Sequence, residues 1–382
     1  MAQRHHVYLV PGFFGFANLG DLKYFAHVQD ILQSAFARLG IDAAVHPVRT
    51  WPTASVRKRA LRLLQTIAET AGNGEEPIHL IGHSSGGLDA RLLVSAGASL
   101  SEELPAERYA ARVQSIVTVA SPHRGTPLAA AFDSVFGQRV LQVLSLATMY
   151  VLRYGRLPLS AVLRMGGTLV RLDNRMGGGQ DALDQLYGEL LHDFSDDRQN
   201  AIREFFTEVG EDQALLAQLT LPGMEVFNAT TRDQPEVRYG CVLTRGRPPG
   251  IRSTVSAGLG AYGQASHALY IALYRLTAQT PYDRASMPDY PQIVAMRRAW
   301  GETPDLRTND GIVPTLSQLW GEVICAVTAD HHDVIGHFDD PEHDPPHYDW
   351  ISSGSGFSRN DFERLWVGVA DWIAAGVLAT KA

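Results

Sequence analysis

The sequence contains only two cysteines, and this scarcity excludes a small fold held together by disulfide bonds. Cys241 and Cys325 lie in separate apolar segments that have the length of a strand. A disulfide scaffold carries more cysteines in a much shorter chain. We therefore predict two buried free thiols. Free thiols favour a cytoplasmic location, although secretion through an export signal stays open.

The chain also lacks long apolar runs and blocks of basic residues. The longest apolar stretch, around residues 141–152, is broken by polar residues and is shorter than the roughly 20 residues of a membrane-spanning helix. The apolar run at residues 7–10 has only the length of a strand, so no signal peptide is predicted. The formal net charge is −8 and the pI is about 5.9, so nucleic acid is not an expected partner.

The first third of the chain alternates between strand and helix patterns. Short apolar runs and segments with apolar residues at helical spacing follow one another. The predicted strands are 7–10, 43–48, 78–81 and 113–120, and the predicted helices are 21–39, 55–72 and the segment after Gly86. This alternation predicts an α/β fold, with a mostly parallel sheet covered by helices on both faces. Sites in such sheets lie at the carboxyl ends of the strands.

A long segment without strand patterns interrupts this alternation. Residues 128–222 are predicted to be almost wholly helical. Helices inserted over the mouth of a site would act as a lid that gates access and excludes water. The alternative is extra helical packing against the core. No linker is recognisable, so we predict one domain over residues 1–382 with residues 128–222 as an inserted helical lid or cap.

Strand patterns return in the last part of the chain, at residues 237–244 and 322–327. Between them, residues 245–307 are predicted to be rich in loops, with a helix from about 266 to 276. Ser358 and Asp361 form a capping pattern at the start of a last helix.

The segment Gly82-His83-Ser84-Ser85-Gly86 has the pattern G-x-S-x-G. A strand that turns sharply into a helix leaves no room for side chains two residues before or after the serine. Ser84 would lie on a strained turn with its hydroxyl exposed, beside a helix N-terminus that favours developing negative charge. The alternative is a glycine-rich turn that matches by chance. The strand pattern before it and the helix pattern after it are the context that the motif requires.

A serine hydroxyl becomes a nucleophile when a base accepts its proton and an acid orients that base. In this type of sheet the chain order is serine, acid, histidine. Asp310 lies in a tight turn that contains Gly311, although an ordinary turn carboxylate is the alternative. His331 follows the last predicted strand, and its neighbour His332 is the rival. Chain order alone leaves the choice between the two histidines open.

Several segments together resemble bacterial triacylglycerol lipases, the group that includes the Pseudomonas/Burkholderia and the thermoalkalophilic Bacillus-type enzymes of the α/β-hydrolase superfamily. They are Gly82–Gly87, Pro122–Thr126, Leu219–Asn228, Asn309–Val313 and Asp330–Gly336. The resemblance covers roughly residues 5–127 and 215–337, whereas residues 128–214 match no part of the family. It implies that Ser84 is the nucleophile, Asp310 the acid and His331 the base, because the family's histidine follows an Asp or Asn.

The oxyanion hole of such a site needs two backbone N–H donors. One is expected from Ser85, the residue after the nucleophile. The resemblance places the other in the loop after the first strand, where the family usually has His-Gly, and implies the N–H of Phe13. Pro11 stands at the histidine position and removes a side-chain hydrogen bond that steadies this loop in the family. Phe13, Phe14 and Phe16 are candidates for an acyl groove, with ordinary core packing as the alternative.

Residues 329–349 contain five histidines and six aspartates. Such a segment is commonly a solvated loop. The resemblance implies a structural Ca²⁺ near the catalytic histidine, with Asp333 as a ligand and Asp340 or Asp339 as a further oxygen donor, because carboxylate oxygens suit this ion. The spacing to Asp340 departs from the family. The histidines could instead hold Zn²⁺.

These observations predict a serine carboxylic ester hydrolase with lipase-like character that needs no cofactor for its chemistry. Its expected substrate is an apolar acyl ester, such as an acylglycerol or a polyester, reached in part through transient contact with a lipid interface. One alternative is a short-chain esterase, a thioesterase or an acyltransferase. Another is a non-catalytic ligand-binding protein on a hydrolase scaffold.

Overall fold

Within the described residues of this α/β protein, six parallel strands form one sheet in the order β2-β1-β3-β4-β5-β6. The computed structural model describes residues 3–13, 24–98, 100–173, 180–258, 260–279, 287–349 and 351–379. The strands are β1 (His5–Val10), β2 (Ala43–Pro47), β3 (Ile78–His83), β4 (Val113–Val119), β5 (Arg238–Arg245) and β6 (Glu322–Thr328). All six lie where the sequence predicts them, and the predicted fold class is confirmed.

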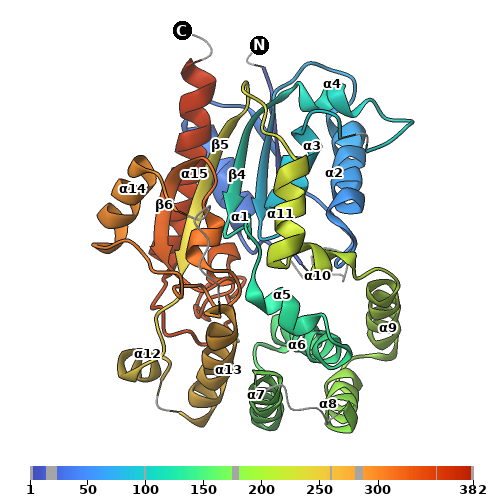
Figure 1. Cartoon of the computed structure of the whole chain (residues 1–382), viewed down its shortest axis with the longest axis vertical. Helices are drawn as coiled ribbons and strands as arrows, with labels where there is room; N and C mark the ends of the chain where they lie inside the picture. Colours follow the sequence, from blue (N-terminus) through green and yellow to red (C-terminus); the bar gives the residue numbers. More distant parts are fainter. Residues whose placement is uncertain are drawn as a thin grey trace.

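Helices cover both faces of the sheet because successive strand residues point to opposite sides. On one face, Leu9 packs in a cluster with α1 (Val28–Arg38) and α15 (Arg359–Ala379). On the other face, Tyr8 and Val10 pack with α2 (Val56–Ala71) and α3 (Gly86–Val94). The short α4 (Ala106–Ala110) and α11 (Leu221–Thr230) lie near α2 and α3 in Figure 1.

The helix termini agree with the sequence at two places and differ at a third. Ser55 caps α2 by accepting a hydrogen bond from the N–H of Lys58, and Ser358 and Asp361 cap α15 reciprocally. The predicted helix 21–39 begins later, at Val28, so that prediction is wrong for residues 24–27. The preceding residue, His27, has φ 60°, in the left-handed region, which interrupts a right-handed helix.

A second layer of helices lies beyond the carboxyl ends of the strands, at the end of the molecule opposite both termini (Figure 1). It contains α5 (Pro127–Phe132), α6 (Val135–Tyr154), α7 (Leu159–Asp173), α8 (Gln180–His192), α9 (Asp196–Glu211) and α10 (Ala214–Gln218). The predicted helicity of this insertion is confirmed for the part that the structure describes. These helices share their own apolar cluster with α13 (Ala261–Thr277), separate from the clusters on the sheet faces.

The segment 245–307 is more helical than predicted. It contains α12 (Ile251–Ser256), α13 and α14 (Tyr290–Trp300). The prediction of a loop-rich segment is wrong, because α12 and α14 were not predicted and α13 begins at Ala261, before the predicted start at about 266. The buried residues of α13 include polar Ser266 and His267. Nδ1 of His267 is paired with the carbonyl oxygen of Ser352. Because polar residues lie among the buried positions of α13, its sequence shows no simple amphipathic stripe.

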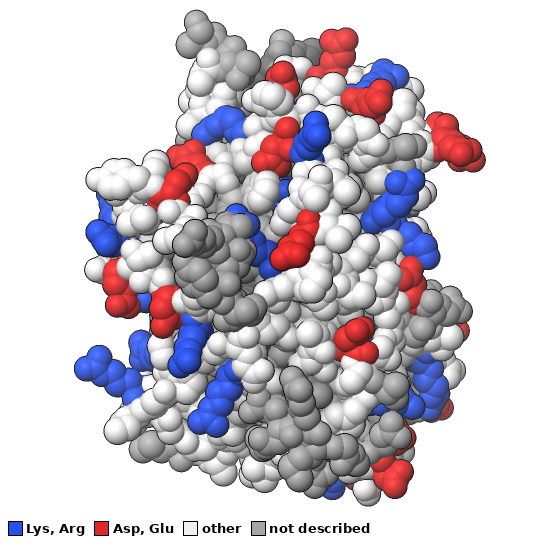
Figure 2. Space-filling view, in the orientation of Figure 1, with Lys and Arg blue, Asp and Glu red and all other residues white. Residues whose placement is uncertain are grey.

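Other properties of the surface and core follow the composition. Cys241 and Cys325 are free thiols, as predicted, but Cys241 is buried whereas Cys325 is only partly buried. Within the described ranges, no helix is long and apolar enough to span a bilayer. On the face drawn in Figure 2, acidic and basic side chains are interspersed rather than gathered by sign.

Candidate active site

Ser84 lies on a strained turn between β3 and α3. Its φ is 54°, a left-handed conformation that residues other than glycine rarely adopt. A Cβ on Gly82 would lie 2.4 Å from the backbone of Gly86, and a Cβ on Gly86 would lie 2.2 Å from the carbonyl oxygen of Val10. Both glycines are therefore required by direct backbone contact, for the steric reason that the motif suggests.

Asp310 and His331 form a buried hydrogen-bonded pair. The distance between Oδ2 of Asp310 and Nδ1 of His331 is 2.8 Å, and the N–H of His331 also donates to the carbonyl of Asp310. His332, the rival from chain order, follows directly, but the ring that bonds this carboxylate at 2.8 Å is that of His331. The pairing decides between the two histidines as partner of Asp310.

The carboxylate of Asp310 is held by four further donors. Its Oδ1 accepts from the backbone N–H groups of Ile312 and Val313, at 3.0 and 2.7 Å. Its Oδ2 accepts from the hydroxyl of Thr244 on β5, at 2.7 Å, and from the amide of Gln318, at 3.2 Å. Together these hydrogen bonds fix the plane of the carboxylate. Neither Thr244 nor Gln318 is recognisable as part of the site from a sequence motif.

Ser84 and His331 line the same apolar cavity, which has a volume of about 130 Å³. The two side chains are nearly buried, at 6% and 4% exposure. The walls come largely from the second layer of helices and from α13, and include Phe132, Leu141, Leu144, Leu216, Leu219 and Leu273. Phe13 also lines the cavity, whereas Phe14 and Phe16 lie outside the described residues. The insertion thus forms one side of the space above the serine.

The loop after β1 lies directly against the serine. A Cβ on Gly12 would be 2.5 Å from the Cβ of Ser84. The guanidinium of Arg59 donates to the carbonyl of Pro11 at 2.6 Å, and the N–H of Gly12 donates to the hydroxyl of Tyr24 at 2.9 Å. Because Pro11 stands in place of histidine, this loop was expected to lose a stabilising hydrogen bond. The contacts with Arg59 and Tyr24 hold the loop instead.

Arg59 is itself held by an ion pair that the sequence did not reveal. Its guanidinium lies 2.8 Å from Asp89 of α3, and both side chains are fully buried. Burial raises the pKa of Asp89 to about 6. A buried pair of this kind is strongly destabilised when one partner is removed, because the other charge stays behind uncompensated. The pair therefore fixes the β1 loop relative to the helix that follows Ser84.

The other oxyanion donor predicted from sequence is Ser85, which is the N-cap residue of α3. The first N–H groups of a helix have no partner within the helix and point out of its end. Their combined dipole favours an anion there. Ser85 directly follows Ser84, and Phe13 lies in the loop after β1 that packs against Ser84. Their role as oxyanion donors stays a prediction.

His83 connects the β1 loop to the loop that carries His331. Its Nδ1 lies 2.7 Å from the hydroxyl of Tyr24, and its Nε2 lies 3.0 Å from the carbonyl oxygen of His331. A carbonyl can only accept, so Nε2 carries the proton and Nδ1 accepts from Tyr24. Burial lowers the pKa of His83 well below its usual value and raises the pKa of Tyr24, so both groups are neutral.

Asp333 and Asp340, the two residues predicted to bind calcium, have different hydrogen-bond partners. Oδ2 of Asp333 accepts from the N–H of Asp330 and from the hydroxyl of Ser355. Asp340 pairs with His347 through backbone hydrogen bonds. Among the residues that the structure describes, neither belongs to a group of three or more potential ligands that could hold a metal. Ca²⁺ binding by Asp333 and Asp340 stays a prediction.

Comparisons with known proteins place this geometry in a common fold. Residues 53–148 match the family model of the PGAP1-like alpha/beta domain. Among curated proteins, none matches the sequence. In structure, the chain is similar to lipase 1 from Pelosinus fermentans, with TM-score 0.52, 19% identity and coverage of 97% of this chain and 99% of the lipase.

Two further solved structures are similar over almost the whole chain. EstA from Clostridium botulinum has TM-score 0.51 and 16% identity, with coverage of 98% of this chain and 88% of EstA. A metagenomic carboxyl esterase has TM-score 0.50 and 17% identity, with coverage of 99% of this chain and 76% of the esterase. Identities this low establish the fold alone, and the chain has the α/β-hydrolase fold.

Proposed function

We propose that this protein is a serine carboxylic ester hydrolase that cleaves apolar acyl esters through an acyl-enzyme. The observation that carries the proposal is the position of Ser84 and His331 in one apolar cavity, with His331 bonded to Asp310 at 2.8 Å. The fold that the chain shares with lipases and esterases is consistent with this chemistry but does not by itself specify it.

In the proposed reaction, Nε2 of His331 accepts the proton of the Ser84 hydroxyl as its oxygen attacks the ester carbonyl carbon. Asp310 holds the opposite nitrogen protonated and stabilises the imidazolium that forms. The N–H groups of Phe13 and Ser85 donate to the carbonyl oxygen as it becomes negative. The imidazolium then gives its proton to the leaving alcohol, and water attacks the acyl group with His331 again as the base.

The cavity wall supports an apolar acyl group as the substrate portion bound beside Ser84. Leucine and phenylalanine side chains on α5, α6 and α13 form that wall, so binding an acyl chain removes apolar surface from water on both partners. We propose the insertion 128–222 as the lid of this site, because its helices supply the wall. Exposed apolar residues on the same layer, including Leu159 and Leu163 of α7, are suited to transient contact with a lipid interface.

Two measurements test the proposal. A fluorophosphonate probe should label the protein covalently at one site, and Ser84→Ala should abolish the labelling. Hydrolysis of p-nitrophenyl esters of increasing chain length should then give kcat/KM values that rise toward medium and long chains. Labelling that persists in Ser84→Ala would exclude this serine as the nucleophile, and a preference for acetyl esters would favour a short-chain esterase.

A further inference from the structure

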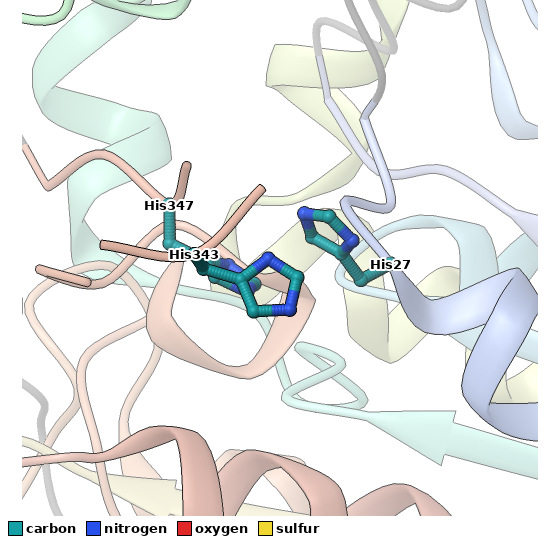
Figure 3. Close-up of side chains that lie close together, drawn as sticks. All are labelled: His27, His343 and His347. Atoms are coloured by element: carbon teal, nitrogen blue, oxygen red, sulfur yellow. The ribbon is translucent and has the colours of Figure 1, made fainter. Parts of the chain in front are cut away.

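Three histidines from distant parts of the chain face one another beside the active-site loops. They are His27, at the start of α1, and His343 and His347, in the loop after the 3-10 helix η3 (Asp333–Ile335) (Figure 3). One ring nitrogen from each lies within 4.8 Å of the others. The ring centroids are 4.4 to 5.0 Å apart.

Two of the three rings are already oriented by backbone carbonyls. Nδ1 of His347 lies 2.6 Å from the carbonyl oxygen of Gly336, and Nδ1 of His343 lies 2.8 Å from that of Pro345. Because a carbonyl oxygen only accepts, each Nδ1 carries the proton and each Nε2 keeps a free lone pair. Metal-bound histidines almost always have this arrangement, with the second nitrogen donating to a carbonyl or carboxylate.

The positions of the rings are fixed by packing and by backbone conformation. His347 is buried and stacks on Phe338, with centroids 4.2 Å apart. His27 has φ 60°, which residues other than glycine rarely adopt and which places its side chain against the two others. Packing of neutral aromatic rings alone would explain the short distances between the rings. It would not explain the free Nε2 lone pairs of His343 and His347.

The surroundings leave room for a fourth ligand. The three histidines line a hollow of about 390 Å³, together with the acidic residues Asp30, Asp344 and Glu363 and the basic residues Arg38 and Arg359, the last of which is paired with Glu363. We propose that His27, His343 and His347 bind one Zn²⁺ ion, with water or one of these carboxylates at the fourth position. Imidazole suits zinc rather than Ca²⁺ or Mg²⁺, which prefer oxygen, and three protein ligands with one open position is an established zinc arrangement.

The ion would join two segments that both carry parts of the active site. They already touch, since the N–H of Ala26 donates to the carbonyl of Ile335 at 2.9 Å and His337 bonds the carbonyl of Tyr24 at 3.0 Å. The first segment holds Tyr24, which bonds Gly12, and the second follows His331. Zinc at this position is a structural clamp, and it takes no part in the attack on the ester.

The test uses tag-free protein freed of metal by chelation and dialysis. Zinc titration by calorimetry and elemental analysis should give one Zn²⁺ per chain, with a rise in melting temperature. Co²⁺ in its place should give the visible absorption of a four-coordinate site. His343→Ala should weaken binding by more than the about 10–100-fold that loss of an outer-shell partner costs. His27→Asn tests the other segment, because asparagine tolerates the left-handed conformation.

His192→Ala is the matched control, since His192 is an exposed histidine on α8. It should keep the zinc stoichiometry and the zinc-dependent melting temperature. The metal-free melting temperature of each variant, taken from circular dichroism, separates loss of binding from loss of folding. Equal zinc affinity in wild type, folded His343→Ala and folded His27→Asn would overturn the proposal, as would a wild type whose melting temperature ignores zinc.

Discussion

The hydroxyl of Tyr24 lies 2.7 Å from Nδ1 of His83, and through His83 it links the loop after β1 to the loop that carries His331. The same hydroxyl accepts from the N–H of Gly12, while the other nitrogen of His83 donates to the carbonyl of His331. Each donor and acceptor in this series of hydrogen bonds has one defined role. His83, the strand residue next to Ser84, thereby connects the loop after β1 with the loop that carries His331.

Tyr24→Phe should therefore lower ester hydrolysis without removing any proposed catalytic group. It leaves the Gly12 N–H and His83 Nδ1 buried and unsatisfied, at about 1–3 kcal/mol each. We expect kcat to fall about tenfold or more, since complete loss of an oxyanion donor costs ~2.7–4 kcal/mol, with KM for a soluble ester little changed. Tyr109→Phe, a buried tyrosine on α4 away from the cavity, is the control. A variant in which only KM changes and kcat is unaltered would assign Tyr24 to substrate binding instead.

Asp310→Asn should keep the fold but lose most of the activity. The asparagine can occupy the same space, but it does not stabilise the imidazolium and favours the wrong tautomer of His331. Replacement of this kind in a serine triad lowers kcat by about 10⁴-fold. The measurement is kcat on a p-nitrophenyl ester, with Asp42→Asn as the control because Asp42 forms only an exposed pair with Arg4. Near-normal activity in Asp310→Asn would show that another acid orients the base.

The glycines of the turn can be compared with a glycine in an open helix position. In Gly82→Ala the new methyl group meets the backbone of Gly86 at 2.4 Å, so we expect overpacking of at least the usual ~1–3 kcal/mol. In Gly167→Ala, on α7, nothing lies within 4 Å, and alanine should stabilise the helix by about 0.5–1 kcal/mol. Urea unfolding measures both. Equal stability of the two variants would contradict the tight turn.

Buried neutral histidines should make the protein sensitive to acid. Burial lowers the pKa of His79 to about 3 and that of His123 well below its usual 6.5. Below pH 6.5 the unfolded chain binds protons at these sites while the folded chain does not. The free energy of unfolding should then fall as the pH falls, by about 1.4 kcal/mol per pH unit for each histidine.

Asp330 acts in the opposite direction, because burial raises its pKa to about 6 and stability from this group is lost as the pH rises through that value. Urea unfolding between pH 7.5 and 5 gives the net slope. His79→Gln should reduce the slope of the unfolding free energy against pH by about 1.4 kcal/mol per pH unit, which corresponds to one proton. The exposed control His192→Gln should leave this slope unchanged. A slope that is the same in all three proteins would mean that His79 is protonated when folded.

Calcium and zinc binding can be separated in one series of measurements. If Asp333 binds Ca²⁺, millimolar calcium should raise the melting temperature of metal-free wild type but not that of Asp333→Asn. The zinc response should survive in Asp333→Asn, because the three histidines are intact. No response of the wild type to calcium would remove the calcium prediction and leave Asp333 as the hydrogen-bond acceptor of Asp330 and Ser355.

Local patterns in the sequence determined much of this protein. Alternating apolar runs and amphipathic segments predict the parallel sheet, because strand and helix periods differ and are written into neighbouring residues. The glycines around Ser84 predict the tight turn, and chain order predicts Asp310 as the acid. The helix boundary near His27 and the helices α12 and α14 were missed, and α13 begins earlier than predicted, because these conformations depend on distant contacts rather than on local periodicity.

Only the tertiary structure decided which distant groups meet. His83 and the carbonyl of His331 are separated by 248 residues, and Arg59 and the carbonyl of Pro11 by 48. The sequence left His331 and His332 as alternatives by order, and the contact of 2.8 Å with Asp310 selects His331. His27 carries no local sign that it faces His343 and His347. Hydrogen bonds and metal ligands act over about 2–3 Å in space, whereas a local pattern contains information only about neighbours along the chain.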